Sequence, residues 1–324
     1  SLKEFDWYAF GKSPREISER VVTILEGAKH AANTDFSRFD GRVVRFMRDL
    51  ERAILLRAFP PEYHEEIMEL HRNNISVLGF GSFGTKYETY YSRLSGSPET
   101  GAFNSIINAF IAYCSFRRLR SLGQTKGYVT PKMAWDMLGI YGGDDGCTAN
   151  LPEQAYVATA KALGQKLDIE IIPAGDAGIT FLSRRYSPDV WEGDTSSCCS
   201  ILRSISKFHT RVKRAEKFEE WEYLVMKAYS FYLTDRHTPL IGPYVSKVME
   251  LSAPDYTSKL KHDTTHMSWF SWYSSEDNWP QESTEWMMDF VEPLNELGFD
   301  HGTYTGWIES CKTLEELREC PQMC

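Results

Sequence analysis

The chain has 324 residues, of which 42% are hydrophobic and 25% charged, so it can bury a large core as one elaborated domain or as two to three smaller ones. Its formal net charge of −9 is unusual for a nucleic-acid binder, so any such surface is local or comes from a segment outside this chain. No apolar run reaches the roughly 20 residues that a transmembrane helix needs. Because the chain starts at Ser1 with an acidic, aromatic stretch rather than a signal peptide, we expect a fragment of a longer protein.

The first predicted elements carry a pair of carboxylates. A capping box from Ser13 to Glu16, with proline at the first helical position, predicts a helix. Residues 30–36 are predicted to form a strand that ends near Asp35, and Asp40 follows just beyond it. Two carboxylates in this arrangement can face a single pocket, although an aspartate at a strand end followed by Asp-Gly is also ordinary turn chemistry.

The next stretch predicts two helices and a hairpin. Residues 42–58 have an amphipathic pattern with an outer face of arginines, and a second helix follows Pro60 and Pro61 to about Asn73. Residues 79–84 match G-x-G-x-x-G, but a β-rich run follows them in place of a helix. Since that motif needs a strand-to-helix turn to aim amide groups at a pyrophosphate, we interpret it as the Gly-rich tip of a hairpin.

A row of polar residues then interrupts an apolar helix pattern. Ser97 is the expected N-cap of this long helix and Pro98 its first residue. Thr100, Asn104 and Asn108 recur at four-residue intervals and so share one face. Burying these side chains costs free energy unless they are paired, so they form either a structural network or a contact with a ligand.

The stretch at residues 141–146 predicts a tight hairpin turn with two adjacent carboxylates. Asp144 and Asp145 lie side by side there, and their charges repel each other. A divalent cation would relieve that repulsion, since Mg²⁺ is commonly held by one or two carboxylates together with substrate phosphates. Asp-Gly is also common hairpin chemistry, so the turn alone does not distinguish a metal site from a plain turn.

The rest of the chain is predicted to contain both a helix and strands up to residue 186 and to be helical from residue 201 onward. We expect a helix at 151–163, a strand at 166–172, an extended run at 179–186 and helices at 201–214 and 218–234. Thr313 begins a capping box for a final helix. The tryptophans of this part are expected in the core rather than in base stacking: Trp269, Trp272, Trp279, Trp286 and Trp307.

Zinc-binding patterns are weak. The seven cysteines are odd in number and lack C-x-x-C spacing, which predicts free thiols in a reducing compartment. His262 and His266 imitate the zinc motif H-E-x-x-H with Asp263 in place of Glu. The β-branched pair between them weakens a helix and no third ligand is evident, so we do not assign a zinc site.

Three short motifs, taken in order, resemble the palm of viral RNA-directed RNA polymerases. Asp35 to Asp40 matches D-x-x-x-x-D, residues 95–104 match S-G-x-x-x-T-x-x-x-N, and residues 143–145 match G-D-D, which are motifs A, B and C of that family. Five stretches in and around these motifs are most similar to nodavirus replicases, with tombusvirus-like enzymes as the alternative: residues 7–12, 37–41, 145–146, 233–235 and 238–242.

The resemblance implies a role for each motif residue in two-metal nucleotidyl transfer. Two Mg²⁺ ions, with Mn²⁺ as a substitute, are expected at three catalytic carboxylates: Asp35 and Asp144 as shared ligands and Asp145 as a supporting one. Asp40 and Asn104 are expected to recognise the ribose of the incoming NTP. Ser95 and Thr100 would support them, and Gly96 belongs to the same expected NTP-binding set. A reverse transcriptase, the alternative polymerase, would carry a bulky aromatic residue at position 40.

The implied fold is α+β, a right-hand polymerase with an antiparallel palm sheet and helices, a partial fingers insertion and a helical thumb. Residues 1–34 would lead into the fingers and palm, residues 35–190 would form the palm with the fingers insertion at about 42–94, and residues 191–324 would form the thumb. The family's basic fingers motif should precede Asp35, where 34 residues are too few to hold it. We therefore expect little activity from residues 1–324 alone.

Two further assignments rest on the same resemblance. Residues 179–186 look like motif E, so Arg184 and Arg185 are expected to contact primer or RNA phosphate, unless they are a solvated charge pair. Motif D normally supplies a lysine as general acid to the leaving pyrophosphate. The sequence leaves that role open between Lys166, Lys161 and water.

The expected partners are an RNA template, the nascent strand and NTPs. Self-association within a viral replication complex, and membrane attachment through regions absent from this chain, are also implied. The expected location is a membrane-bound complex in the host cytoplasm, at the mitochondrial outer membrane for a nodavirus-like protein. The competing hypothesis is a non-catalytic RNA-binding or assembly module that retains the fold.

Overall fold

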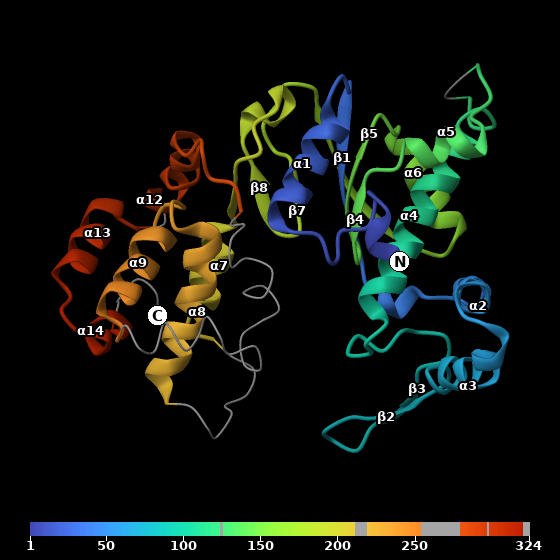
Figure 1. The fold of residues 1–324 in the computed structure, drawn as a ribbon, viewed down its shortest axis with the longest axis horizontal. Coiled ribbons are helices and arrows are strands. Elements are labelled where there is room, and N and C mark those ends of the chain that lie inside the picture. The colour runs from blue at the N-terminus through green and yellow to red at the C-terminus, as the bar shows by residue number, and fades with distance from the viewer. Residues whose placement is uncertain (124–125, 211–218, 254–278, 297, 320–324) are drawn as a thin grey trace. The chain divides into compact units, whose positions relative to one another are not determined.

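A computed structural model describes residues 1–123, 126–210, 219–253, 279–296 and 298–319 (Figure 1). The chain divides into two compact units. The first combines residues 1–11 with 27–174, and the second combines residues 12–26 with 175–324. Each unit contains both helices and antiparallel strands.

The first unit is built on a four-stranded antiparallel sheet with the order β4-β5-β1-β6. Its strands are β1 (His30–Phe36), β4 (Ile140–Gly142), β5 (Asp145–Ala149) and β6 (Leu167–Pro173). The register places Thr34 opposite Gly146, so the ends of β1 and of the β4–β5 hairpin are adjacent. The strand predicted at residues 30–36 and the hairpin predicted at 141–146 are both confirmed.

Helices pack on this sheet and close a core. The helices are α4 (Thr100–Arg118), α5 (Pro131–Asp136) and α6 (Glu153–Ala162); α4 contacts β4 and β5, and α6 contacts β6. The fully buried Ile111 and Phe116 of α4 lie in this core with Tyr156 of α6. Since α4 is buried along most of its length, its polar residues must be paired, which decides the geometry of the site below.

The start of α4 differs from the expectation. Ser97 does not cap the helix and Pro98 is not its first residue, because α4 begins at Thr100 with Glu99 as a cap whose side chain accepts no N–H of the helix. The Ser97 hydroxyl instead donates to the Glu99 carboxylate. A cap would need the Ser97 hydroxyl oxygen to accept an N–H of the first turn, whereas here the hydroxyl is turned toward the Glu99 carboxylate as a donor.

An insertion between β1 and α4 carries two helices and a hairpin. It contains the short 3₁₀ turn η2 (Asp40–Arg42), α2 (Arg45–Ala58), η3 (Pro61–Tyr63), α3 (His64–Asn73), β2 (Leu78–Phe80) and β3 (Lys86–Glu88). The Gly-rich run forms the tip between β2 and β3, where the Gly81 N–H donates to Thr85 O at 2.7 Å. The hairpin interpretation is therefore confirmed, and the run opens no helix.

The second unit has a small sheet and a helical part. Its elements are α1 (Pro14–Leu25), β7 (Thr180–Phe181), β8 (Arg184–Tyr186), η4 (Pro188–Glu192), β9 (Ser197–Cys199), α7 (Ile201–Lys207), α8 (Glu220–Asp235), α9 (Ile241–Leu251), η5 (Glu285–Phe290), α12 (Glu292–Glu296), α13 (His301–Ser310) and α14 (Leu314–Arg318). The capping boxes at Ser13 and Thr313 are both present.

Some expectations fall outside the described residues. These are the end of the helix predicted at 201–214, the His262–His266 motif, Trp269 and Trp272, and Cys320 and Cys324. The other five cysteines are free thiols, as predicted. Trp279 is buried, and Trp307 packs against the core of the second unit.

Candidate active site

The end of β1 presents the first carboxylates. Asp35 is exposed, and its Oδ1 accepts the N–H of Phe36 at 2.7 Å. Arg38 follows in the left-handed region with φ of 57°, which turns the chain sharply into the Asp40 segment. The side chains of Asp35 and Asp40 thus come from the strand end and from the turn that follows it, as the sequence predicted.

Two hydrogen bonds join Asp40 to α4 and to the loop that precedes it. Its Oδ1 accepts from Asn104 Nδ2 at 2.8 Å and its Oδ2 accepts from Ser95 Oγ at 2.5 Å. The Thr100 hydroxyl donates to Leu94 O at 2.9 Å, which closes the loop that contains Ser95 and Gly96. The Asp40 carboxylate is therefore bound to Asn104, which lies 64 positions later in the chain.

The β4–β5 hairpin is anchored by α4. Gly143 has φ of 71°, a conformation that glycine adopts without strain at the tight turn. The Gly143 N–H donates to Ser105 Oγ at 2.8 Å, and Asn108 Nδ2 lies 3.0–3.3 Å from the carbonyl oxygens of Gly143, Asp144 and Asp145. The predicted polar face thus divides into Asn104, which contacts Asp40, and Asn108, which holds the backbone of the turn.

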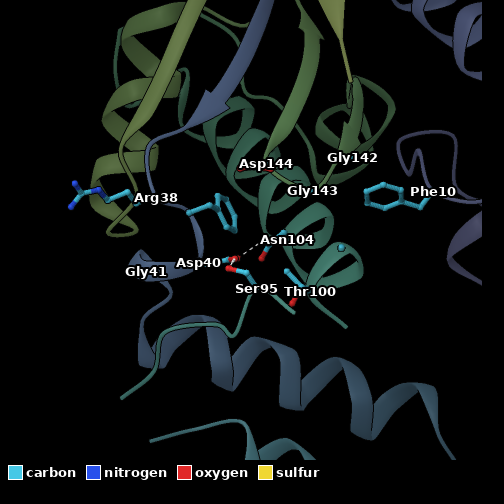
Figure 2. Close-up of a pocket in the computed structure, with 12 residues that line it drawn as sticks. Phe10, Arg38, Asp40, Gly41, Ser95, Thr100, Asn104, Gly142, Gly143 and Asp144 are labelled. Carbon is cyan, nitrogen blue, oxygen red and sulfur yellow. Dashed lines mark hydrogen bonds between the residues drawn. The ribbon is translucent and has the colours of Figure 1, made fainter. Parts of the chain in front are cut away.

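These elements surround one open pocket of about 540 Å³. Figure 2 shows Asp40, Ser95 and Asn104 pointing toward one another, with Phe10 across the pocket from Arg38. Of the predicted site residues, Asp35, Gly96 and Asp145 do not line the pocket. The residues that line it are Phe10, Arg38, Phe39, Asp40, Gly41, Ser95, Thr100, Gly101, Asn104, Gly142, Gly143 and Asp144.

Phe10 and Arg38 were not recognised in the sequence. A Cβ added to Gly101 would come within 3.2 Å of the Phe10 ring, so glycine there lets the ring lie close to α4. The aromatic opening segment of the chain was visible in the sequence, but nothing local places it at a site whose other residues lie between positions 38 and 144. The parallel bridge of Tyr8 with Tyr141 is what brings it there.

The electrostatics of Asp144 differ from those of an ordinary aspartate. Burial raises its pKa, and the neighbouring carboxylates of Asp35 and Asp40 raise it further, although a hydrogen bond from its own backbone N–H opposes the change. Three carboxylates therefore act on one another at this end of the sheet. Bringing like charges together in a half-buried pocket is unfavourable unless a cation is present.

The carboxylate oxygens at this site suit a metal ion that takes its remaining ligands from the substrate. Within the described part of the chain, no group of three or more His, Cys, Asp or Glu side chains is arranged to hold an ion on its own. Oxygen donors on two carboxylates, with the remaining positions supplied by water and phosphate, are the usual environment of Mg²⁺. Asp35 and Asp144 are the residues that would hold such an ion.

The two arginines predicted to contact RNA, Arg184 and Arg185, differ in their exposure to solvent. Arg184 is buried: its Nη1 lies 2.9 Å from Asp235 Oδ2, and its Cζ is 4.5 Å from the Trp279 ring centroid. Because its guanidinium is fully engaged inside the second unit, we correct the assignment of Arg184 from RNA contact to structural ion pair. Arg185 is exposed, with its Cζ 4.4 Å from the Phe290 ring centroid.

Comparison with known proteins agrees with this geometry. The family model described as viral RNA-dependent RNA polymerase matches residues 3–213, which include all three motifs. The chain belongs to the viral RNA-dependent RNA polymerase family. Members of this family generally use divalent metal ions.

Relatives of the chain come from nodaviruses and similar viruses. It is 31% identical to the RNA-directed RNA polymerase of Greasy grouper nervous necrosis virus and 32% identical to that of Striped jack nervous necrosis virus, in each case over 92% of this chain and 29% of the relative. It is 28% identical to the enzyme of Nodamura virus over 85% of this chain. The nodavirus resemblance is confirmed, and the chain spans less than a third of the length of these curated relatives.

The fold of the chain also matches solved structures. The RNA-dependent RNA polymerase of a human picorbirnavirus superposes with a TM-score of 0.61 at 13% identity, covering 87% of this chain and 55% of that one. The predicted α+β right-hand polymerase fold is therefore confirmed. Among the described helices, none is both long and apolar enough to cross a membrane.

Proposed function

We propose that the protein carrying this chain catalyses template-directed RNA synthesis in viral genome replication and transcription. The observation that supports this most strongly is the convergence of Asp40, Asn104 and Asp144 on one pocket, with the charge of Asp35 acting on Asp144. These are the family's motif residues, and they come from three separate segments of the chain.

In this reaction the 3′-hydroxyl of the nascent strand attacks the α-phosphate of an NTP. The pocket contributes positioning and charge, because phosphoryl transfer requires little covalent chemistry from the protein. Asp35 and Asp144 are proposed to hold two divalent ions, Mg²⁺ with Mn²⁺ as a substitute, and Asp145 to support them. When bound, such ions neutralise and orient the attacking and leaving oxygens.

Asp40 and Asn104 are proposed to recognise the ribose. A carboxylate accepts from a 2′-hydroxyl and an amide N–H donates to it, so the pair can distinguish ribose from deoxyribose. Ser95 and Thr100 support this arrangement: Ser95 donates to Asp40, and Thr100 closes the loop that carries Ser95 and Gly96. A small acidic residue at position 40 also argues against the reverse transcriptase alternative.

Two basic residues are proposed to serve the rest of the reaction. The backbone carbonyl of Lys166 accepts the Ser37 N–H at 3.0 Å, only two residues beyond Asp35, which favours Lys166 over Lys161 as general acid to the pyrophosphate. Arg185, which is exposed, is the remaining proposed contact with primer or RNA phosphate. Both proposals rest on position and charge.

The wider context is also a proposal. RNA template, nascent strand and NTPs are the partners that the reaction needs. Self-association, and attachment to a membrane such as the mitochondrial outer membrane through regions outside this chain, are inferred from the resemblance to nodavirus replicases.

Primer extension by the full-length protein tests the proposal. We expect NMP incorporation that requires a divalent cation and follows the template sequence, with Asp40→Ala reducing the preference for NTP over dNTP. A protein that binds RNA but incorporates no nucleotide under any divalent cation would instead support the non-catalytic assembly module. Unchanged sugar preference in Asp40→Ala would contradict the ribose role alone.

A further inference from the structure

A buried ion network lies next to the proposed ribose pair. Glu51 of α2 pairs with Arg93 at 2.5 Å and with Arg48 at 3.1 Å, and its Oε2 lies 3.2 Å from His71 Nε2. The side chains of Arg93, Glu51 and Arg48 are 0%, 1% and 3% exposed. Buried ion pairs are weak stabilisers compared with apolar packing, and Arg93 Nη1 is buried without a hydrogen-bond partner among the described residues, so this network calls for a second explanation.

Arg93 is the member of the network that contacts the proposed ribose pair. Its Nε donates to Asn104 Oδ1 at 2.6 Å while its Nη2 donates to Glu51. Its backbone N–H donates to Asp40 O at 2.9 Å. Arg93 therefore contacts both members of the ribose pair, Asp40 through its main chain and Asn104 through its side chain.

These contacts fix the orientation of the Asn104 amide. The Arg93 guanidinium has only donors, so it requires the amide oxygen, and the Asp40 carboxylate has only acceptors, so it requires the amide nitrogen. A flipped amide would place oxygen against carboxylate and N–H against guanidinium, which is repulsive on both sides. The low dielectric of a buried site strengthens both the favourable and the unfavourable arrangement.

We propose that Arg93 is a positioning residue for sugar selection: held by Glu51, it fixes the Asn104 amide so that its N–H groups face Asp40 and the ribose. This inference rests on the proposed role of Asp40 and Asn104 and adds the residues that orient them. Arg93 does not line the pocket, so it acts through Asn104. Its guanidinium geometry matters as much as its charge, since lysine offers one point charge in place of a planar fork.

Arg48 provides a matched control. It has the same charge, is equally buried and pairs with the same Glu51. Its other hydrogen bonds go to the backbone carbonyls of Tyr91 and Ser92 rather than to Asn104. Arg93→Lys and Arg48→Lys therefore disturb the network in the same chemical way, but only Arg93→Lys releases the Asn104 amide.

The test is the ratio of kcat/KM for NTP to that for the matching dNTP in the full-length protein. We expect Arg93→Lys to lower this ratio about tenfold, chiefly through a higher KM for NTP, because one oriented polar contact is lost. Arg48→Lys should keep the wild-type ratio. In an Asn104→Ala background, Arg93→Lys should lower the ratio no further.

The outcomes are distinguishable. A wild-type ratio in Arg93→Lys, together with a reduced ratio in Asn104→Ala, overturns the role of Arg93 but leaves the proposed function intact. An equal loss in Arg48→Lys also overturns it, because the effect would then come from the network as a whole. An unchanged ratio in Asn104→Ala removes the ribose role and this inference with it. If Arg93→Lys does not fold, the same ratio is measured in Glu51→Gln, which removes the charge that holds Arg93. A wild-type ratio in Glu51→Gln would also contradict the role of Arg93.

Discussion

Asn108 gives the sharpest test of how α4 holds the hairpin that carries Asp144. The side chain is fully buried, and one amide group contacts three consecutive carbonyl oxygens of the turn. Asn108→Ala removes these donors from the buried Gly143 carbonyl and from the partly buried carbonyls of Asp144 and Asp145. The Gly143 N–H keeps its bond to Ser105, so the turn is weakened rather than lost.

The size of the effect follows from the contacts. Leaving a buried polar group unsatisfied costs about 1–3 kcal/mol, which corresponds to roughly 5- to 150-fold faster hydrogen exchange by local opening of the hairpin. Since Asp144 lies in this turn, we expect the rate of RNA synthesis to fall as well. Asn108→Asp should be worse, because it places a carboxylate against three carbonyl oxygens and beside Asp144.

Hydrogen exchange read by mass spectrometry on peptides covering residues 140–149 measures this directly. Ser115→Ala is the matched control: Ser115 lies two turns further along the same face of α4, is fully buried and donates to Ile111 O of its own helix. It should leave exchange in the hairpin unchanged. Wild-type exchange in Asn108→Ala, or equal acceleration in Ser115→Ala, would refute the anchoring role.

Two further predictions concern the second unit. Asp235→Asn should lower the free energy of unfolding by about 3–5 kcal/mol in urea titrations, because it leaves Arg184 buried without its counter-charge. Burial raises the pKa of Asp235, but the Arg184 guanidinium outweighs burial and holds that pKa below 3.8. The charged Asp235 therefore stabilises the fold above pH 3.8, and this stabilisation is lost as the pH falls below 3.8. Asp235→Asn should lack this acid-dependent loss of stability, and an unchanged loss would exclude Asp235 as its source. Burial raises the pKa of Cys198 to about 12, so native protein at pH 8 should alkylate this thiol far more slowly than unfolded protein, and equal rates would contradict its burial.

Local rules account for what the sequence predicted well. The strand at residues 30–36, the Gly-rich hairpin tip and the two capping boxes depend on neighbours within a few positions, and all are present. Ser97 failed under the same rules, because its hydroxyl donates to the nearby Glu99 carboxylate and accepts no N–H of the helix. Local patterns name the competing groups but do not rank them.

The site itself was predictable only through the order of three motifs. Each motif alone is also ordinary turn or helix chemistry, and the sequence could not divide the polar face of α4 between Asn104 and Asn108. Long-range pairs left no local signal: Arg184 meets Asp235, 51 positions later, and Arg93 meets Glu51, 42 positions earlier. An arginine on a strand looks the same in sequence whether its partner is phosphate or a buried carboxylate.

The central claim is that Asp144 belongs to the metal-dependent centre of an RNA polymerase, and one comparison tests it most directly. Template-directed NMP incorporation should be measured for the full-length protein, for Asp144→Asn and for Asp136→Asn, an exposed aspartate that pairs with Lys132 on α5. Asp144→Asn should abolish synthesis without loss of folding, while Asp136→Asn retains wild-type activity. Synthesis by Asp144→Asn at the wild-type rate would contradict the account.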